Sequence, residues 1–183
     1  PVRYPGSGET IASLQEDDAA QVAMAVAAAK ARFESGEWSQ SNIEERQRVL
    51  RATAQAIRTH ANDLALRESI CAGLPLAHLA ARQIPRAADN FDFFADYIGL
   101  LAGETFDQLQ EYRTVITRHP VGVAALFAPW NACLALSSMQ VASCIAFGNS
   151  CVLKPSEFSP LAVLQLVHLL ESAGLPSGVV NIV

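Results

Sequence analysis

The chain has 183 residues, of which 51% are hydrophobic and only 17% charged, and its formal net charge is −5. A chain of this length can bury a sizeable core. Its share of charged residues is below the roughly 25% that is typical of soluble domains. The acidic balance, without a basic stripe or a recognition motif, argues against a nucleic-acid partner.

Residues 1–111 are predicted to be mainly helical. Asp17 and Asp18 precede an Ala-rich helix that runs to about Phe33, and Gly36 follows its end. Aspartate before an apolar periodic run and glycine after it are typical helix boundaries.

A second helix is expected behind Ser41-Asn42-Ile43-Glu44. This segment fits the capping box, in which a Ser side chain and a Glu carboxylate each satisfy a backbone N–H. The spacing of later residues predicts one helical face, made of Val49, Leu50, Thr53, Ile57 and His60. A third helix is expected from near Asn62 to Cys71, because Gly73 and Pro75 follow.

A fourth helix is predicted from about Gln83 to Leu101, with Pro85 in its first turn. Its apolar side chains recur at helical spacing and include Phe91, Phe94 and Ile98. Such a stripe indicates core packing rather than a ligand-binding surface.

The pattern changes at residue 112, because residues 112–183 hold only five of the 31 charged side chains. Strands are expected at 112–119, 121–128, 150–153 and 179–183. One helix is expected at 132–147. A second is expected to run to Ala173, with Ser159 as its N-cap and Pro160 at its first position. The alternation predicts an α/β fold in which the N-terminal helices precede the start of a parallel, Rossmann-like βαβαβ sheet with right-handed crossovers.

Three strands and two crossover helices make half of a nucleotide-binding unit, so the chain is interpreted as a fragment holding an incomplete domain. The expected parts are a helical segment (1–111), a bridging strand (112–119) and the first βαβαβ of a cofactor-binding domain (120–183).

The most informative residues follow the predicted strand at 150–153. Lys154 is one of only two lysines, and it ends an uncharged run that begins at His119. Lys154 and Glu157 lie where open α/β sheets bind ligands, and a carboxylate there can accept both hydroxyls of a ribose. Because a carboxylate repels a 2′-phosphate, Glu157 favours NAD over NADP. The alternative is a surface salt bridge, which contributes little.

Asn131 follows Pro129 and Trp130 at the preceding junction between strand and helix. Its amide could donate to an oxygen that gains charge in a transition state. The alternative is a helix N-cap, which Asn favours strongly. Trp130 could equally pack at the end of the sheet.

The four cysteines, Cys71, Cys133, Cys144 and Cys151, show neither a CxxC motif nor Cys/His ligand spacing. They are predicted to be buried free thiols in a reducing, cytoplasmic compartment, and no metal site is expected. No basic segment precedes an apolar one, so no signal peptide is predicted.

Several ordered segments carry a resemblance to a known family. They are Pro120-Val121-Gly122-Val123, Ala128-Pro129-Trp130-Asn131, the run 146–157, Ser159-Pro160-Leu161, Ala173-Gly174-Leu175-Pro176 and the run 178–183. Together they resemble the aldehyde dehydrogenase superfamily. Upstream, Glu45-Arg46 and the run 85–91 with Phe94-Ala95 are similar to members that oxidise semialdehydes of aromatic catabolism.

The resemblance implies oxidation of a small aldehyde to a carboxylic acid with NAD, or NADP, as hydride acceptor. A cysteine thiolate attacks the aldehyde, and a glutamate-activated water hydrolyses the thioester. Asn131 would hold the oxyanion. The adenosine half of the cofactor would be bound by Phe127, Ala128, Pro129, Trp130, Lys154, Ser156 and Glu157. Residues 103–118 would form a bridging hairpin of a homodimer or homotetramer.

The chain departs from the family pattern at Ala132-Cys133, where an apolar residue and Pro are usual, and at Gln140 and Ser143, where Lys and Pro are frequent. The family's catalytic cysteine and glutamate lie beyond Val183, so this chain alone is expected to be inactive. A non-catalytic nucleotide-binding or structural protein on the same fold remains an alternative. A membrane span in the uncharged run is disfavoured because polar residues interrupt it repeatedly.

Overall fold

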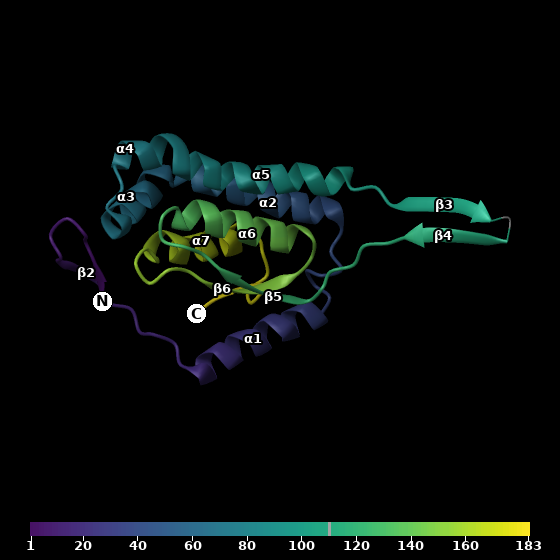
Figure 1. Ribbon diagram of the computed structural model, residues 1–183, viewed down its shortest axis with the longest axis horizontal. Helices are drawn as coiled ribbons and strands as arrows, with labels where there is room; N and C mark the ends of the chain where they lie inside the picture. The colour runs from purple at the N-terminus through teal and green to yellow at the C-terminus, as the bar shows by residue number, and fades with distance from the viewer. Residues whose placement is uncertain (110) are drawn as a thin grey trace.

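The computed structural model describes residues 1–109 and 111–183, and Figure 1 shows how its elements are arranged. In chain order they are β1 (Val2–Arg3), β2 (Thr10–Ala12), α1 (Ala19–Glu34), α2 (Ile43–Thr59), α3 (Ala61–Ala72), α4 (Leu76–His78), the π-helical turn η1 (Leu79–Gln83), α5 (Ile84–Leu100), β3 (Glu104–Leu109), β4 (Tyr112–Ile116), β5 (Val123–Phe127), α6 (Cys133–Ala146), β6 (Ser150–Lys154), α7 (Leu161–Ser172) and β7 (Val180–Ile182).

The sheet β5-β6-β7 is parallel, with β6 in the middle. Figure 1 shows α6 and α7 on one face of this sheet, α2 and α5 stacked beyond them, and α1 on the opposite face. Helices therefore lie on both faces of the parallel sheet, and its middle strand β6 is buried from Ser150 to Leu153, whereas β5 at the edge alternates between exposed and half-buried residues. The predicted βαβαβ arrangement behind N-terminal helices is confirmed.

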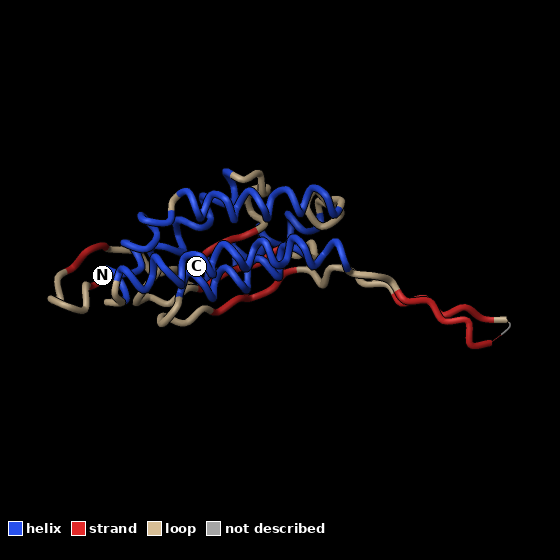
Figure 2. Tube along the Cα trace, turned by 90° about the horizontal axis from the view of Figure 1, so that it is seen from above, coloured by secondary structure: helices blue, strands red, loops and turns tan. Residues whose placement is uncertain are grey.

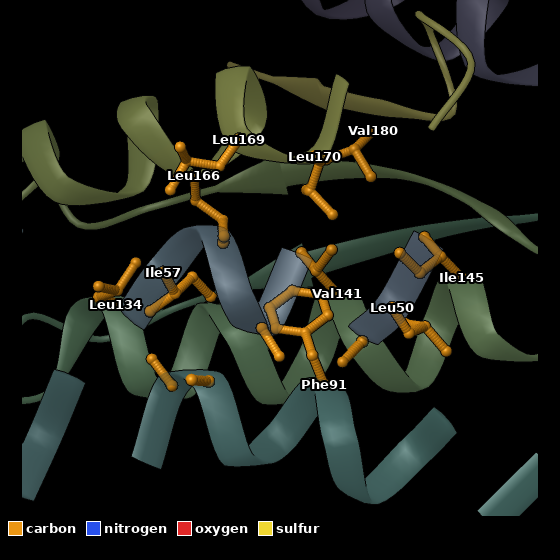
Figure 3. Close-up of a cluster of buried hydrophobic side chains, with 14 of the residues drawn as sticks. Leu50, Ile57, Phe91, Leu134, Val141, Ile145, Leu166, Leu169, Leu170 and Val180 are labelled. Carbon is orange, nitrogen blue, oxygen red and sulfur yellow. The ribbon is translucent and has the colours of Figure 1, made fainter. Parts of the chain in front are cut away.

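The hydrophobic core lies between the sheet and the stacked helices. Figure 3 shows side chains that meet there, and these include Ile57 of α2, Phe91 of α5, Leu134 of α6 and Leu166 of α7. All four side chains are fully buried. The predicted faces of the second and fourth helices are confirmed at Val49, Leu50, Thr53, Ile57, Phe91 and Ile98.

The predicted capping box at the start of α2 is wrong by one residue. Asn42 is the N-cap, and its side chain accepts a hydrogen bond from the Glu45 N–H. The Ser41 hydroxyl instead donates to the carbonyl of Trp38 at 2.7 Å and accepts from Arg46. Both residues are good caps locally, and the loop around Trp38 decides between them.

The fourth predicted helix is confirmed as α5, but α4 and η1, which lead directly into it from Leu76 to Gln83, were not predicted. The Ile84 N–H donates to the carbonyl of Leu79, five residues earlier. This wider turn directly precedes Pro85, which cannot donate in a regular helix. Pro85 lies in the first turn of α5, as predicted, although a helical segment precedes that turn.

The start of α7 also differs from the prediction. Pro160 is the N-cap and the helix begins at Leu161, while the buried Ser159 hydroxyl has no hydrogen-bond partner among the described residues. The first and last strands of the parallel sheet are shorter than predicted, at Val123–Phe127 and Val180–Ile182.

Two antiparallel pairs lie outside the parallel sheet. The N-terminal pair β1–β2 was not expected. The predicted strand 112–119 is observed as β4, ends at Ile116, and pairs with β3. Figure 2 shows β3 and β4 projecting away from the body of the molecule. Within the described part of the chain, no helix combines the length and apolarity needed to cross a bilayer.

Candidate functional site

Two neighbouring strands bring the predicted site segments to one edge of the sheet. Phe127, the last residue of β5, lies opposite Lys154, the last residue of β6, and the Ala128 N–H donates to the Lys154 carbonyl at 3.1 Å. The two segments that follow, 128–131 and 155–157, therefore begin side by side. In parallel sheets this carboxyl edge is where ligands bind.

Lys154 and Glu157 form an ion pair at this edge. The Lys154 ammonium lies 3.2 Å from Glu157 Oε2 and donates to the Pro155 carbonyl at 3.1 Å. The two side chains are 47% and 66% exposed, so the pair stabilises the fold little. A hydrogen bond from its own backbone, then Lys154, lowers the pKa of Glu157. The edge thus presents an ammonium and an ionised carboxylate that remain accessible to a ligand.

Ser156 differs from its two charged neighbours, because its side chain is buried. The Ser156 hydroxyl accepts a hydrogen bond from the Phe158 N–H at 3.3 Å, which closes the loop after β6. The structure therefore places Ser156 beside Lys154 and Glu157 but turns its side chain into the loop.

Asn131 is exposed and lies in the turn between β5 and α6. It is not the helix N-cap, because that position belongs to Ala132, which has no side chain able to cap. Among the described residues, no hydrogen bond to the Asn131 side chain is found. The N-cap interpretation is wrong, and the Asn131 amide is free to meet a ligand.

Large apolar side chains surround the strand ends. Phe127, Trp130 and Phe158 are 68%, 53% and 63% exposed, whereas Ala128 is buried. Trp130 therefore does not pack fully against the end of the sheet. Exposed aromatic side chains beside charged groups are typical of surfaces that meet a ligand or further protein.

Gln140 of α6 contacts the end of β5 in a way that the sequence did not indicate. Its side-chain amide donates to the Phe127 carbonyl at 2.9 Å, while the Ser143 hydroxyl donates to the Gln140 carbonyl. Gln140 thus holds the last residue of β5 against α6. The sequence analysis noted Gln140 and Ser143 only as departures from the family pattern. No local spacing in the sequence signals a contact between a helix and the end of the preceding strand.

Glu68 is a second residue that the sequence analysis missed. It is fully buried on α3, and its Oε1 accepts a hydrogen bond from the Leu134 N–H at the start of α6 at 3.3 Å. Burial raises the pKa of Glu68, while the N–H groups of Leu134 and Cys133 oppose that effect. A sequence signal did exist, because Glu68 shares the buried face of α3 with Leu64 and Cys71.

The four cysteines are free and buried, in agreement with the prediction. Burial raises the pKa of Cys133 to about 11, although Cys133 lies close to Asn131 in sequence. A nucleophilic cysteine needs a lowered pKa and access to its substrate. None of the four combines these properties, and the described residues hold no cluster of side chains suited to a metal ion.

A groove of about 520 Å³ runs along the free edge of β5. It is lined by residues 121–127 together with side chains of α6 that include Gln140 and Ser143. Lys154 and Glu157 do not line it. The groove therefore reaches Phe127 at the end of β5 but does not include the two charged side chains.

Comparison with known proteins extends this picture. Residues 1–183 match the model of the aldehyde dehydrogenase family. The chain is 37% identical to the NADP/NAD-dependent aldehyde dehydrogenase PuuC of Escherichia coli K12 over 98% of its own length and 36% of that protein. It is also 37% identical to the 5-carboxymethyl-2-hydroxymuconate semialdehyde dehydrogenase of Escherichia coli, over 98% of the chain and 38% of the relative. The chain thus spans little more than a third of these relatives.

Solved structures agree with the sequence relatives. The betaine aldehyde dehydrogenase of Staphylococcus aureus, in complex with NAD+, superposes with a TM-score of 0.95 at 33% identity, over 100% of this chain and 37% of that one. The aldehyde dehydrogenase KauB of Pseudomonas aeruginosa gives a TM-score of 0.97 at 32% identity, with 100% and 37% covered.

Proposed function

Because the chain belongs to the aldehyde dehydrogenase family, whose members oxidise aldehydes with NAD or NADP, we propose that the natural polypeptide carrying it oxidises an aldehyde, or a semialdehyde, to a carboxylic acid. The observation that carries this proposal is the pairing of Phe127 with Lys154 across the sheet, which brings Asn131 and the pair Lys154–Glu157 to one edge.

Asn131 is assigned the role of oxyanion donor. When a nucleophile attacks an aldehyde, the carbonyl oxygen gains negative charge, and a fixed amide N–H stabilises that charge. The Asn131 side chain is exposed, is not used as a helix cap, and lies beside the end of β5. These three features support the assignment.

The residues present fit the adenosine half of NAD(P)+. The Lys154 ammonium can donate to ribose hydroxyls, and the Glu157 carboxylate can accept from both of them. The backbone of 127–130 and the side chain of Trp130 offer surface beside these two groups. When bound, the cofactor supplies the acceptor for the hydride that leaves the aldehyde carbon.

The nucleophile is proposed to lie outside residues 1–183. The state of the four cysteines supports this, since all are buried and the pKa of Cys133 is raised to about 11. We therefore expect this chain alone to be inactive.

Asn131 is tested in the natural polypeptide by steady-state oxidation of a panel of aldehydes with NAD+. Loss of one oxyanion donor typically lowers kcat by about 10²–10³-fold, and we expect an effect of that order for Asn131→Ala. Its Kd for NAD+ should stay unchanged, because Asn131 is not assigned to the adenosine half. A wild-type kcat in the folded variant would refute the assignment.

The cofactor preference is tested by Glu157→Gln. Removing the carboxylate should lower the ratio of the NADP+ to the NAD+ dissociation constant by roughly two- to fivefold, the effect expected of an exposed charge. The reason is that a 2′-phosphate is no longer repelled. Glu171→Gln, at an exposed position on α7, is the matched control. The assignment fails if the ratio is the same in both variants.

We further propose that the natural polypeptide is a cytoplasmic homodimer or homotetramer. The β3–β4 hairpin projects from the body and exposes apolar side chains, among them Phe106, Tyr112 and Val115. Exposed apolar surface of this kind suits a contact with a second copy. Four unpaired cysteines suit a reducing compartment. Sedimentation equilibrium of the natural polypeptide tests the assembly, and a monomer would contradict it.

A further inference from the structure

Helix α6 begins directly after the turn that carries Asn131, yet it has no local cap. The first backbone N–H groups of a helix have no partner inside the helix, and buried ones need a partner from elsewhere. Ala132, at the N-cap position, has no side-chain oxygen. Cys133 and Leu134 are fully buried, so water does not reach this turn freely.

Glu68 supplies the missing cap from another helix. Its Oε1 accepts from the Leu134 N–H at 3.3 Å, and the N–H of Cys133 lowers the pKa of this carboxyl group against the effect of burial. Its other oxygen, Oε2, is buried without a partner among the described residues. Burying an incompletely bonded carboxyl group is costly, so a hydrophobic residue would suit the core better unless the cap is needed. The presence of Glu68 in the core is thus better explained by its hydrogen bond to the start of α6 than by a contribution to core stability.

The far end of α6 is also held by side chains from the N-terminal helical part. Trp38 Nε1 donates to the Ile145 carbonyl at 3.0 Å, and Arg46 donates to the Ala146 carbonyl at 3.4 Å. Asn90 of α5 donates to the Ala135 carbonyl near the start. Among these contacts, the one from Glu68 is the one that satisfies an N–H group of the first turn of α6, that of Leu134. Leu134 is only three residues from Asn131.

We propose that Glu68 is a positioning residue for the oxyanion donor: by capping α6 at the Leu134 N–H, it fixes the turn that presents Asn131. This inference rests on the proposed function, because it takes Asn131 to be the donor. A small displacement of a catalytic group can cost about 10²-fold in rate, so a cap three residues away is close enough to matter.

The test compares two variants in the natural polypeptide. Glu68→Gln keeps a side-chain oxygen that can accept from the Leu134 N–H, whereas Glu68→Met has a similar unbranched shape and no such acceptor. Leu170→Ala serves as a stability control, since Figure 3 shows this buried residue of α7 away from Leu134. The readouts are kcat, KM for aldehyde and for NAD+, the thermal midpoint, and peptide hydrogen exchange over residues 129–135.

We expect Glu68→Met to lower kcat by roughly ten- to a hundredfold with KM for NAD+ unchanged, and to speed exchange over 129–135. Glu68→Gln should stay within about threefold of wild type in kcat, and Leu170→Ala should lower the thermal midpoint without lowering kcat. A wild-type kcat in Glu68→Met, or an equal loss in Leu170→Ala, overturns the inference. If Glu68→Met does not fold, Glu68→Gln decides the question. A large loss of kcat in folded Glu68→Gln overturns the inference. A near-wild-type kcat in Glu68→Gln, with unchanged exchange over residues 129–135, supports it.

The exchange measurement separates this inference from the proposed function. If the wild-type polypeptide oxidises no aldehyde, the proposed function fails. Faster exchange in Glu68→Met would then still establish the cap, and unchanged exchange would remove it.

Discussion

Gly148, between α6 and β6, allows the cost of crowding to be separated from the cost of backbone strain. Its φ is +76°, a region that costs a non-glycine residue about 1–2 kcal/mol. A Cβ at this position would lie 3.1 Å from Pro120 Cγ, 3.1 Å from the Ser39 carbonyl oxygen and 3.2 Å from Arg46 Cζ. Since the neighbours include backbone, overpacking adds about 1–3 kcal/mol, so Gly148→Ala should destabilise by about 2–5 kcal/mol in all.

Gly36 is a matched control, because its φ is +79° and a Cβ there would meet only the end of the Gln40 side chain, at 3.1 Å. That side chain can move aside, so Gly36→Ala should cost only the backbone strain of about 1–2 kcal/mol. Both variants restrict the unfolded chain equally, and that effect cancels in the comparison. The assay is urea unfolding of the natural polypeptide, followed by circular dichroism. Equal losses in the two variants would refute the argument from crowding.

Two further predictions concern buried groups of the helical part and α6. The Cys133 thiol should resist alkylation in the folded protein and react after unfolding. Because folding raises its pKa from 9.0 to about 11, the folded state binds this proton more tightly, and the free energy of unfolding should fall as pH rises from about 9 to 11. A Cys133→Ala variant should lose less of that free energy over the same pH range. Arg46→Met should lower the free energy of unfolding by about 2–4 kcal/mol, because the carbonyls of Ser41 and Ala146 lose a charged hydrogen-bond donor. Arg48→Met should change it little, because the ion pair of Arg48 with Glu45 is exposed. Thermal midpoints measure both effects, and a rise in stability of wild type above pH 9, or equal midpoints for the two arginine variants, would contradict them.

Local patterns were sufficient wherever neighbouring residues decide the structure. The alternation of apolar runs with helical spacing from Val121 to Val183 predicted the parallel sheet, since strand and helix periods are set by the backbone. The position of Lys154 and Glu157 after a strand was equally visible, because strand ends in a parallel sheet share one edge. Asp18 was recognisable as a helix start for the same local reason.

Local patterns failed where two local solutions were nearly equal. Ser41 and Asn42 are both good caps, and the contact of Ser41 with Trp38 left Asn42 to begin α2. The pattern also did not predict α4 and the π-helical turn that directly precede α5. Composition alone favoured Asn131 as a helix cap over Asn131 as a donor, and the structure removed the cap interpretation.

The sequence by itself thus determined the order of the longer helices and of the strands in the parallel sheet, the edge of the sheet that carries the candidate site, and the family to which its motifs point. Only the tertiary structure decided how that edge is held. Gln140 reaches Phe127 at the end of β5 from α6, and Glu68 caps Leu134 from 66 residues away. The physical reason is that a hydrogen bond between distant elements depends on how the helices pack, and that packing has no period in the sequence.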